Sequence, residues 1–218
     1  MKKSIISIMA ILLIYFSASA QQTSGIGALQ SAVTKLDQAK TAKDYQALEK
    51  EFVKIEASQP RDWLPNYYAA YCNARIGFLL QDDGDAIEPY SDRGELQAKK
   101  AESLLDKAKQ KRELSELYTV MSMINQSRVF INPMTYGPKY GPIAQQFLNQ
   151  AKQLNPDNPR AIYLAAWFKY NTPKMWGGDK DLAKQLATQS LKLLENAETG
   201  INPHWGKAED QELLSKYK

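Results

Sequence analysis

Two residue types that build many active sites are scarce in this chain of 218 residues, which has one cysteine and one histidine. Cys72 has no partner within the chain for a disulfide, so stability must come from packing. Because Cys72 lies in the apolar run "NYYAAYCNARIGF", we expect a buried and unreactive thiol. A lone histidine offers little to a histidine-based metal site or a histidine-activated nucleophile. We expect His204, in "NPHWG", to act in a local turn or cap.

The charge is close to balanced. Lys and Arg number 28 against 24 Asp and Glu, and two of the basic residues, Lys2 and Lys3, stand at the very start of the chain. No run of basic residues alternates with aromatic ones, which argues against a nucleic-acid partner. The stretch "WGGDK" lacks the spacing and the preceding strand of a phosphate-binding loop. We therefore expect no nucleic acid, no metal and no cofactor.

Acidic residues cluster in two places without forming a recognisable site. The stretch "DDGDAIEP", residues 82–89, lacks the alternating ligand spacing and the final Glu of an EF-hand loop, so we expect a solvated turn. Glu113 and Glu116 stand one helical turn apart, and we expect ordinary solvated charges there. A carboxylate-dependent glycosidase stays open as the enzyme alternative, because its two acids need not be close in sequence.

The first twenty residues have the plan of a secretory signal. A basic start is followed by an apolar run of twelve residues, 5–16, and then by the small residues Ala18, Ser19 and Ala20. The alternative is a membrane anchor, but twelve residues make only about 18 Å of helix against a hydrocarbon core of ~30 Å. We expect cleavage before Gln21, a mature domain over residues 21–218, and a periplasmic or secreted protein without a membrane span.

The rest of the chain predicts an all-α fold. Leu48, Phe52 and Ile55 recur at helical spacing before Pro60, and Ala144, Leu148 and Ala151 recur in the same way before Pro156. Two further copies are the set Ala101, Leu105 and Ala108, which lacks the proline, and the weaker set Ala183, Ala187 and Ser190. Together these patterns predict helices over residues 26–41, 43–58, 63–81, 94–111, 112–130, 141–154, 159–171, 179–196 and 206–216.

The repeated pattern of a small, a bulky and a small residue before proline resembles the second helix of a tetratricopeptide repeat. The stretch "NPDNPRAIYLAAWFKY" is similar to the turn and first helix of that family. The marker positions 48, 101, 144 and 183 are more widely spaced than the family's 34 residues, so the repeats are degenerate. The resemblance implies an α-solenoid of about four helical hairpins, with residues 206–216 as a C-terminal capping helix.

The additional length falls in three inserts between paired helices, residues 79–95, 131–142 and 171–179. Turns of this kind emerge along one edge of a repeat stack, and inserts on one face often mark the binding face. We therefore predict a binding edge formed by large side chains of the inserts, namely Tyr90, Tyr136, Tyr140, Met175 and Trp176. The alternative is structural, in which these aromatic side chains fold back onto the nearest helix.

The resemblance implies an exported, non-enzymatic interaction module that binds a protein or peptide partner of the cell envelope. Its concave face and its loop edge would make the contact. The alternative is a binding protein for a small molecule, such as a sugar or an amphiphile, held in an enclosed pocket with an aromatic lining. The two hypotheses differ in footprint, because a protein partner needs a surface of about 800 Å².

Overall fold

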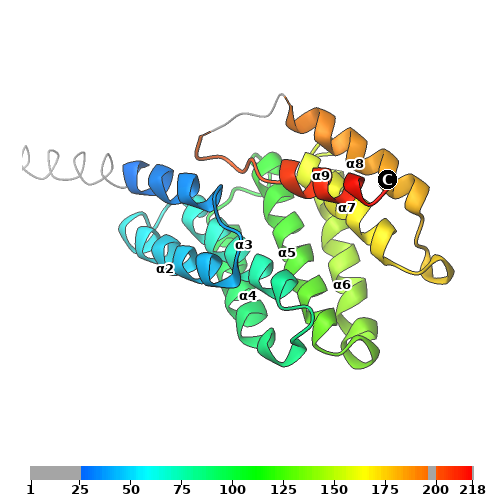
Figure 1. Cartoon of the computed structure of the whole chain (residues 1–218). Helices are drawn as coiled ribbons and strands as arrows, with labels where there is room; N and C mark the ends of the chain where they lie inside the picture. Colours follow the sequence, from blue (N-terminus) through cyan, green and yellow to red (C-terminus); the bar gives the residue numbers. More distant parts are fainter. Residues whose placement is uncertain (1–25, 196–199, 218) are drawn as a thin grey trace, which may run out of the picture.

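The computed structural model describes residues 26–195 and 200–217, and every regular element in these ranges is a helix (Figure 1). The predicted all-α class is therefore confirmed. A helix over residues 26–36, called the N-terminal helix below, is followed by α2 (Ala42–Ser58), α3 (Trp63–Leu79), η1 (Gly84–Ala86), α4 (Glu88–Ser103), α5 (Lys111–Ile131), α6 (Pro133–Leu154), α7 (Pro159–Asn171), η2 (Lys174–Trp176), α8 (Lys180–Leu194) and α9 (Lys207–Ser215). The predicted signal segment lies outside the described residues.

Helix starts follow local capping chemistry. Thr41 and Asp44 form a capping box at the start of α2, in which each side chain accepts a hydrogen bond from the other residue's backbone N–H. The side chains of Asp62, Asn158 and Asp179 accept hydrogen bonds from the first-turn N–H groups of α3, α7 and α8. These four starts lie within one residue of the predicted ones.

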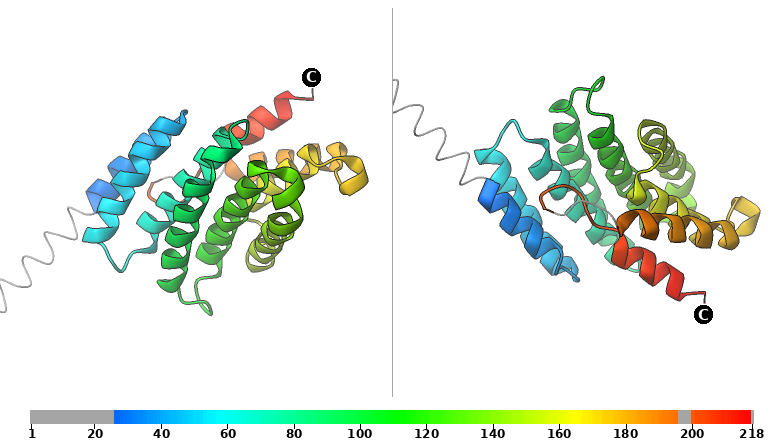
Figure 2. Two further views of the ribbon diagram at one scale, coloured as in Figure 1. Left: turned by 90° about the horizontal axis from the view of Figure 1, so that it is seen from below. Right: turned by 90° about the horizontal axis from the view of Figure 1, so that it is seen from above.

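Consecutive helices pack in pairs, and the pairs are stacked in chain order. The closest packing joins α5 with α6, α3 with α4 and α7 with α8, while α2 packs on α3, α3 on α5, and α5 on α7. The stack therefore runs from the N-terminal helix and α2 at one end to α7 and α8 at the other (Figures 1 and 2). Helix α9 packs mainly on α8.

Small side chains allow the paired helices to approach closely. Ala144, Leu148 and Ala151 of α6 are all buried, as the small-bulky-small pattern predicts. The copy in α4 is shorter than predicted, because α4 ends at Ser103 and Ala108 is exposed in the following turn. The predicted helix over residues 94–111 is thus displaced toward the N-terminus.

The predicted insert over residues 131–142 is wrong, because α6 already begins at Pro133. Asn132 caps the helix by accepting a hydrogen bond from the N–H of Thr135, and proline suits the first helical position since its missing N–H would be unpaired there. Pro138 and Pro142 lie inside α6 on its exposed side. The carbonyl that each proline leaves without an N–H donor can therefore be hydrated.

The C-terminal ends of α3, α5 and α7 meet. Phe78, Phe130 and Trp167 form an edge-to-face cluster with ring centroids 5.1 to 6.1 Å apart. Gly84 of η1 lies against the end of α5, where a Cβ atom would come within 2.6 Å of the Ile131 carbonyl oxygen. The turns after α3 and α5 are therefore packed side by side.

A buried ion pair crosses from α5 to α7 and corrects one prediction. Glu116 and Arg160 are 7% exposed, and the carboxylate accepts two hydrogen bonds of 2.6 Å from Nε and Nη2 of the guanidinium. Glu116 is therefore not a solvated charge. The prediction failed because Arg160 comes from a helix 44 residues further along the chain.

Candidate ligand pocket

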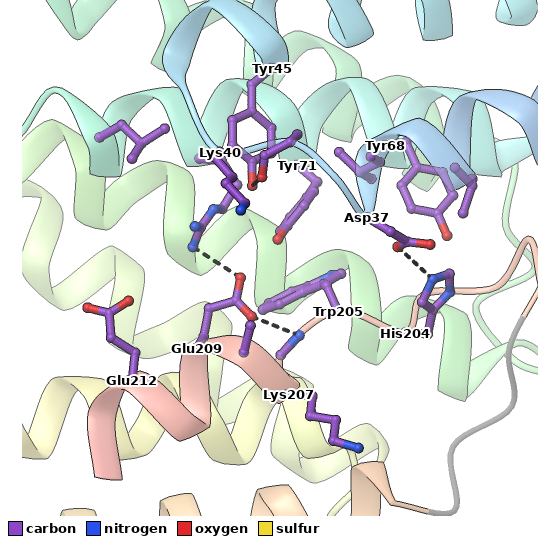
Figure 3. A pocket seen from close by; sticks show the side chains of 17 residues that line it. Asp37, Lys40, Tyr45, Tyr68, Tyr71, His204, Trp205, Lys207, Glu209 and Glu212 are labelled. Carbon is purple, nitrogen blue, oxygen red and sulfur yellow. Dashed lines mark hydrogen bonds and ion pairs between the residues drawn. The ribbon is translucent and has the colours of Figure 1, made fainter. Parts of the chain in front are cut away.

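A pocket of about 460 Å³ lies where the C-terminal part of the chain returns to its N-terminal part. Its walls come from the N-terminal helix, the start of α2, the middle of α3, and residues 204–212 (Figure 3). Its volume is within the range of about 300–1,000 Å³ that is usual for small-molecule sites. Seventeen residues line it: Val33, Leu36, Asp37, Ala39, Lys40, Tyr45, Tyr68, Tyr71, Arg75, Leu79, His204, Trp205, Gly206, Lys207, Ala208, Glu209 and Glu212.

The chain returns because Trp205 and Ile201 are anchored on α3. The indole N–H of Trp205 donates to the Tyr67 hydroxyl at 2.8 Å, and the Tyr68 hydroxyl donates to the Ile201 carbonyl at 2.8 Å. Gly206 follows Trp205 with a φ of 118°, a left-handed conformation that favours glycine, and turns the chain into α9. The two sides of the pocket are thereby fixed to the same helix.

Aromatic rings form one wall of the pocket. Tyr71 and Trp205 are stacked, with ring centroids 4.7 Å apart and planes at 25°, and Tyr45 meets Tyr71 edge to face at 6.4 Å. Burial raises the pKa of the phenols of Tyr45 and Tyr71, so both hydroxyls stay protonated at neutral pH. The wall is uncharged, and because Tyr45 and Tyr71 are only 4% and 2% exposed, the partly buried ring of Trp205 presents most of its flat apolar surface to the pocket.

Positive charge faces the aromatic wall. Arg75 on α3 pairs with Glu209 at 3.3 Å, and its guanidinium lies 5.6 Å from the Tyr45 ring centroid. Burial acts to lower the pKa of Arg75, but its neighbours, the Glu209 carboxylate among them, raise the pKa overall, so the guanidinium stays charged. Lys40 and Lys207 are exposed at the rim, and within the described ranges neither has an ion-pair partner.

His204 links the two ends of the chain at the pocket rim. Its Nε2 lies 2.9 Å from Oδ1 of Asp37, and its Nδ1 lies 2.8 Å from the Asn202 carbonyl oxygen. Both partners are acceptors, so each contact is a hydrogen bond only when the ring nitrogen on that side carries a proton. The predicted local role describes only the second contact, since Asp37 is 167 residues away in sequence.

The carboxylates of the pocket are largely engaged with neighbours. Asp37 contacts His204, while Glu209 pairs with Arg75 and accepts a hydrogen bond from the N–H of Gly206 at 3.1 Å. Glu212 lies 3.6 Å from Lys216. The rim lysines are therefore the pocket cations most available to an anionic ligand.

None of the residues predicted for a binding edge lines this pocket. Tyr136 and Tyr140 lie on α6 rather than in a loop, stacked at 5.6 Å, and Tyr90 lies on α4, where its hydroxyl accepts from Gln46 at 2.6 Å. Met175 and Trp176 do lie in a turn, and they are 82% and 71% exposed. Tyr140 lines a separate cavity of about 270 Å³ between α4, α5 and α6.

The sequence contained a signal for the pocket that the prediction did not use. Helix α3 is apolar on almost all sides, yet its buried face includes Tyr67, Tyr68 and Tyr71, whose hydroxyls need polar partners. Arg75 follows one turn later. Several buried tyrosine hydroxyls on one helix indicate that another part of the chain must supply their hydrogen-bond partners.

Other site types find no support in the described residues. Residues 26–195 and 200–217 contain no group of three or more His, Cys, Asp or Glu side chains that could hold a metal ion. No helix in the same part of the chain is long and apolar enough to cross a membrane.

The stacked helices and the pocket between distant parts of the chain together define an all-helical protein with the layout of a binding protein. No family model matches the sequence, and no curated protein matches it. Among solved structures, the chain is similar to the HusA haemophore from Porphyromonas gingivalis, with 31% sequence identity and a TM-score of 0.74. The match covers 87% of this chain and 90% of the haemophore. The protein belongs to the family of this haemophore.

Proposed function

We propose that the protein is an exported carrier that binds haem or a related carboxylated tetrapyrrole, without enzymatic activity. The observation that carries the proposal is the 31% identity to a haemophore over 87% of the chain, combined with a pocket in which aromatic rings face cations. This is the amphiphile-binding alternative predicted from the sequence. The cargo is a bound substrate and not a resident cofactor.

The side chains of the pocket fit the chemistry of such a ligand. A tetrapyrrole is a flat aromatic ring with carboxylates along one edge, so it needs flat apolar contacts and a few cations. The partly exposed ring of Trp205, supported from behind by Tyr71, offers the first, and the rim lysines Lys40 and Lys207 offer the second. Both nitrogens of His204 already have partners, so His204 would have to leave Asp37 or Asn202 before it could contact a metal.

The proposal is tested by titrating protoporphyrin IX into the purified protein and following quenching of tryptophan fluorescence. The double variant Lys40→Glu/Lys207→Glu reverses both rim charges, and we expect it to bind about tenfold more weakly or worse. The variant Lys50→Glu/Lys54→Glu makes the same charge change at two exposed positions of α2 outside the pocket, and we expect wild-type affinity from it.

A second ligand distinguishes the contribution of the charged contacts to the affinity from that of the ring contacts. Protoporphyrin IX dimethyl ester lacks the carboxylates, so we expect the wild type and both variants to bind it with equal affinity. Failure of the wild type to bind either ligand would refute the carrier proposal. Equal binding of the free acid by the wild type and the rim variant would refute this pocket as its site.

The helix pairs support one finer part of the sequence-based prediction. We propose that they are degenerate tetratricopeptide-like hairpins, since small residues of α4, α6 and α8 are buried at the pair interfaces. A protein or peptide partner on the concave face stays a prediction. Export likewise stays a proposal that rests on the predicted signal and on the haemophore relative.

A further inference from the structure

The turn between α7 and α8 exposes two large apolar side chains next to each other. Met175 is 82% exposed and Trp176 is 71% exposed. Figure 2 shows this turn at the end of the molecule opposite the N-terminal helix, where it projects beyond the neighbouring helices. Two adjacent large apolar side chains form a small exposed patch, and contiguous apolar patches on a protein surface often mark a contact with a partner or a membrane.

The turn is built to hold these side chains outward. The N–H groups of Trp176 and Gly178 both donate to the Pro173 carbonyl, at 2.9 and 3.1 Å, and Lys169 donates through Nζ to the Gly177 carbonyl at 2.8 Å. Gly177 has a φ of 92°, and a Cβ on Gly178 would come within 1.7 Å of the Thr172 carbonyl oxygen. The two glycines are therefore required by a defined conformation, and the apolar tip is presented by a fixed backbone.

Lysine and tyrosine side chains surround the base of the tip. Lys180 and Lys216 lie 4.9 and 5.7 Å from the ring centroid of Tyr170, and Lys184 lies 5.6 Å from that of Tyr217. The two tyrosine rings meet edge to face at 5.4 Å. This cluster brings together the end of α7, the start of α8 and the end of α9.

The charge at this end of the molecule has a positive excess. Five lysines belong to it, namely Lys169, Lys174, Lys180, Lys184 and Lys216, against the three acids Asp179, Asp181 and Glu212. Asp179 is engaged as the N-cap of α8, and Glu212 pairs with Lys216. Lys169 donates to the Gly177 carbonyl, so Lys174, Lys180 and Lys184 are the lysines available to phosphate groups.

We propose that the α7–α8 turn inserts Met175 and Trp176 into the surface of an anionic phospholipid bilayer. Tryptophan prefers the level of the lipid headgroups, and each lysine near an anionic surface adds attraction. The apolar tip consists of two residues, which suits shallow insertion of about 5–10 Å and is small for a protein interface of about 800 Å². The proposal does not depend on which ligand the pocket binds.

Co-sedimentation of the purified protein with vesicles tests the proposal. We expect binding to vesicles of equal parts phosphatidylcholine and phosphatidylglycerol, weaker binding to pure phosphatidylcholine, and loss of binding at high salt. The variant Met175→Ser/Trp176→Ser should bind about tenfold more weakly or worse. The variant Leu96→Ser/Met134→Ser, which removes two other exposed apolar side chains, should bind like the wild type.

Depth quenching provides a direct measurement of insertion. Lipids brominated on the acyl chain should quench part of the tryptophan emission of the wild type but not that of Trp176→Phe. Absence of binding to the phosphatidylglycerol vesicles at low salt overturns the proposal, even if the same turn binds an envelope protein. Equal binding by the wild type and the Met175→Ser/Trp176→Ser variant also overturns it, because the contact would then lie elsewhere.

Discussion

Asp210 is a buried carboxyl on α9 whose hydrogen bonds require a proton. It is 0% exposed, and Ser190 of α8 lies within hydrogen-bond distance of it and 2.8 Å from the Pro159 carbonyl oxygen. The Ser190 hydroxyl has a single proton and two acceptors beside it. If Ser190 donates to Pro159, then Asp210 can bond Ser190 only by donating a proton of its own.

The electrostatic environment of Asp210 also favours its protonated form. Burial raises the pKa of Asp210 most, the bond with Ser190 lowers it, and Glu209 raises it, so that the pKa moves from 3.8 to about 7. The folded protein therefore retains a proton that the unfolded chain loses above pH ~4. Stability due to Asp210 is present at low pH and is lost as the pH rises toward 7.

The size of this effect follows from the two pKa values. Each pH unit between the unfolded and the folded pKa lowers the free energy of unfolding by about 1.4 kcal/mol. The total decrease is about 4 kcal/mol, of which about 2.5 kcal/mol falls between about pH 5 and about pH 8. The variant Asp210→Asn cannot ionise, and its amide N–H can donate to Ser190 as the protonated acid does. We expect the variant to be more stable than the wild type at about pH 8 and to lack this component of the pH dependence.

Urea unfolding of the wild type and Asp210→Asn at several pH values measures the difference in the free energy of unfolding. The pKa values of Glu95 and Glu102 are lowered in the folded protein, so these residues contribute stability that is lost as the pH falls. Both residues are present in the wild type and in Asp210→Asn, so their contribution cancels when the two proteins are compared. The exposed Asp181→Asn is the control and should follow the wild type. Parallel curves for the wild type and Asp210→Asn would refute a protonated Asp210.

Two further predictions concern the core. Glu116→Ala leaves the Arg160 guanidinium buried and unpaired, so we expect a loss of about 3–5 kcal/mol in urea unfolding. A loss below about 1 kcal/mol would mean that water reaches the pair. Burial raises the pKa of the Cys72 thiol well above its usual value, so a thiol reagent should label Cys72 only after unfolding. Rapid labelling of the native protein would contradict its burial.

Much of the helical architecture could be predicted because its signals are local. The starts of α2, α3, α7 and α8 follow from the caps Thr41, Asp62, Asn158 and Asp179, which act within one turn. The insert over residues 131–142 was misread because proline is common both in loops and at helix starts. In this segment Asn132 favours a helix because its side chain caps the helix start.

The pocket could not be predicted, because its walls are brought together by contacts across most of the chain. Tyr67 and Trp205 are 138 residues apart, and Asp37 and His204 are 167 residues apart. The hydrophobic periodicity of the sequence does not predict that residues 201–206 pack back onto α3. The residues predicted for a binding edge lie outside this pocket, three of them on α4 and α6 and two in the α7–α8 turn, and a binding edge formed by them stays a prediction.

The return of the chain makes pocket formation and the docking of α9 a single event. Glu209 and Asp210 are adjacent, so they point to different sides of α9, the first toward Arg75 in the pocket and the second toward Ser190 of α8. The pocket wall therefore exists only while α9 is docked. A ligand that binds this wall must stabilise the docked helix by mass action. Asp210 itself does not line the pocket, and its backbone hydrogen bond to the Gly206 carbonyl is the same in Asp210→Asn. It follows that Asp210→Asn should raise ligand affinity above pH ~7 if undocking of α9 limits binding.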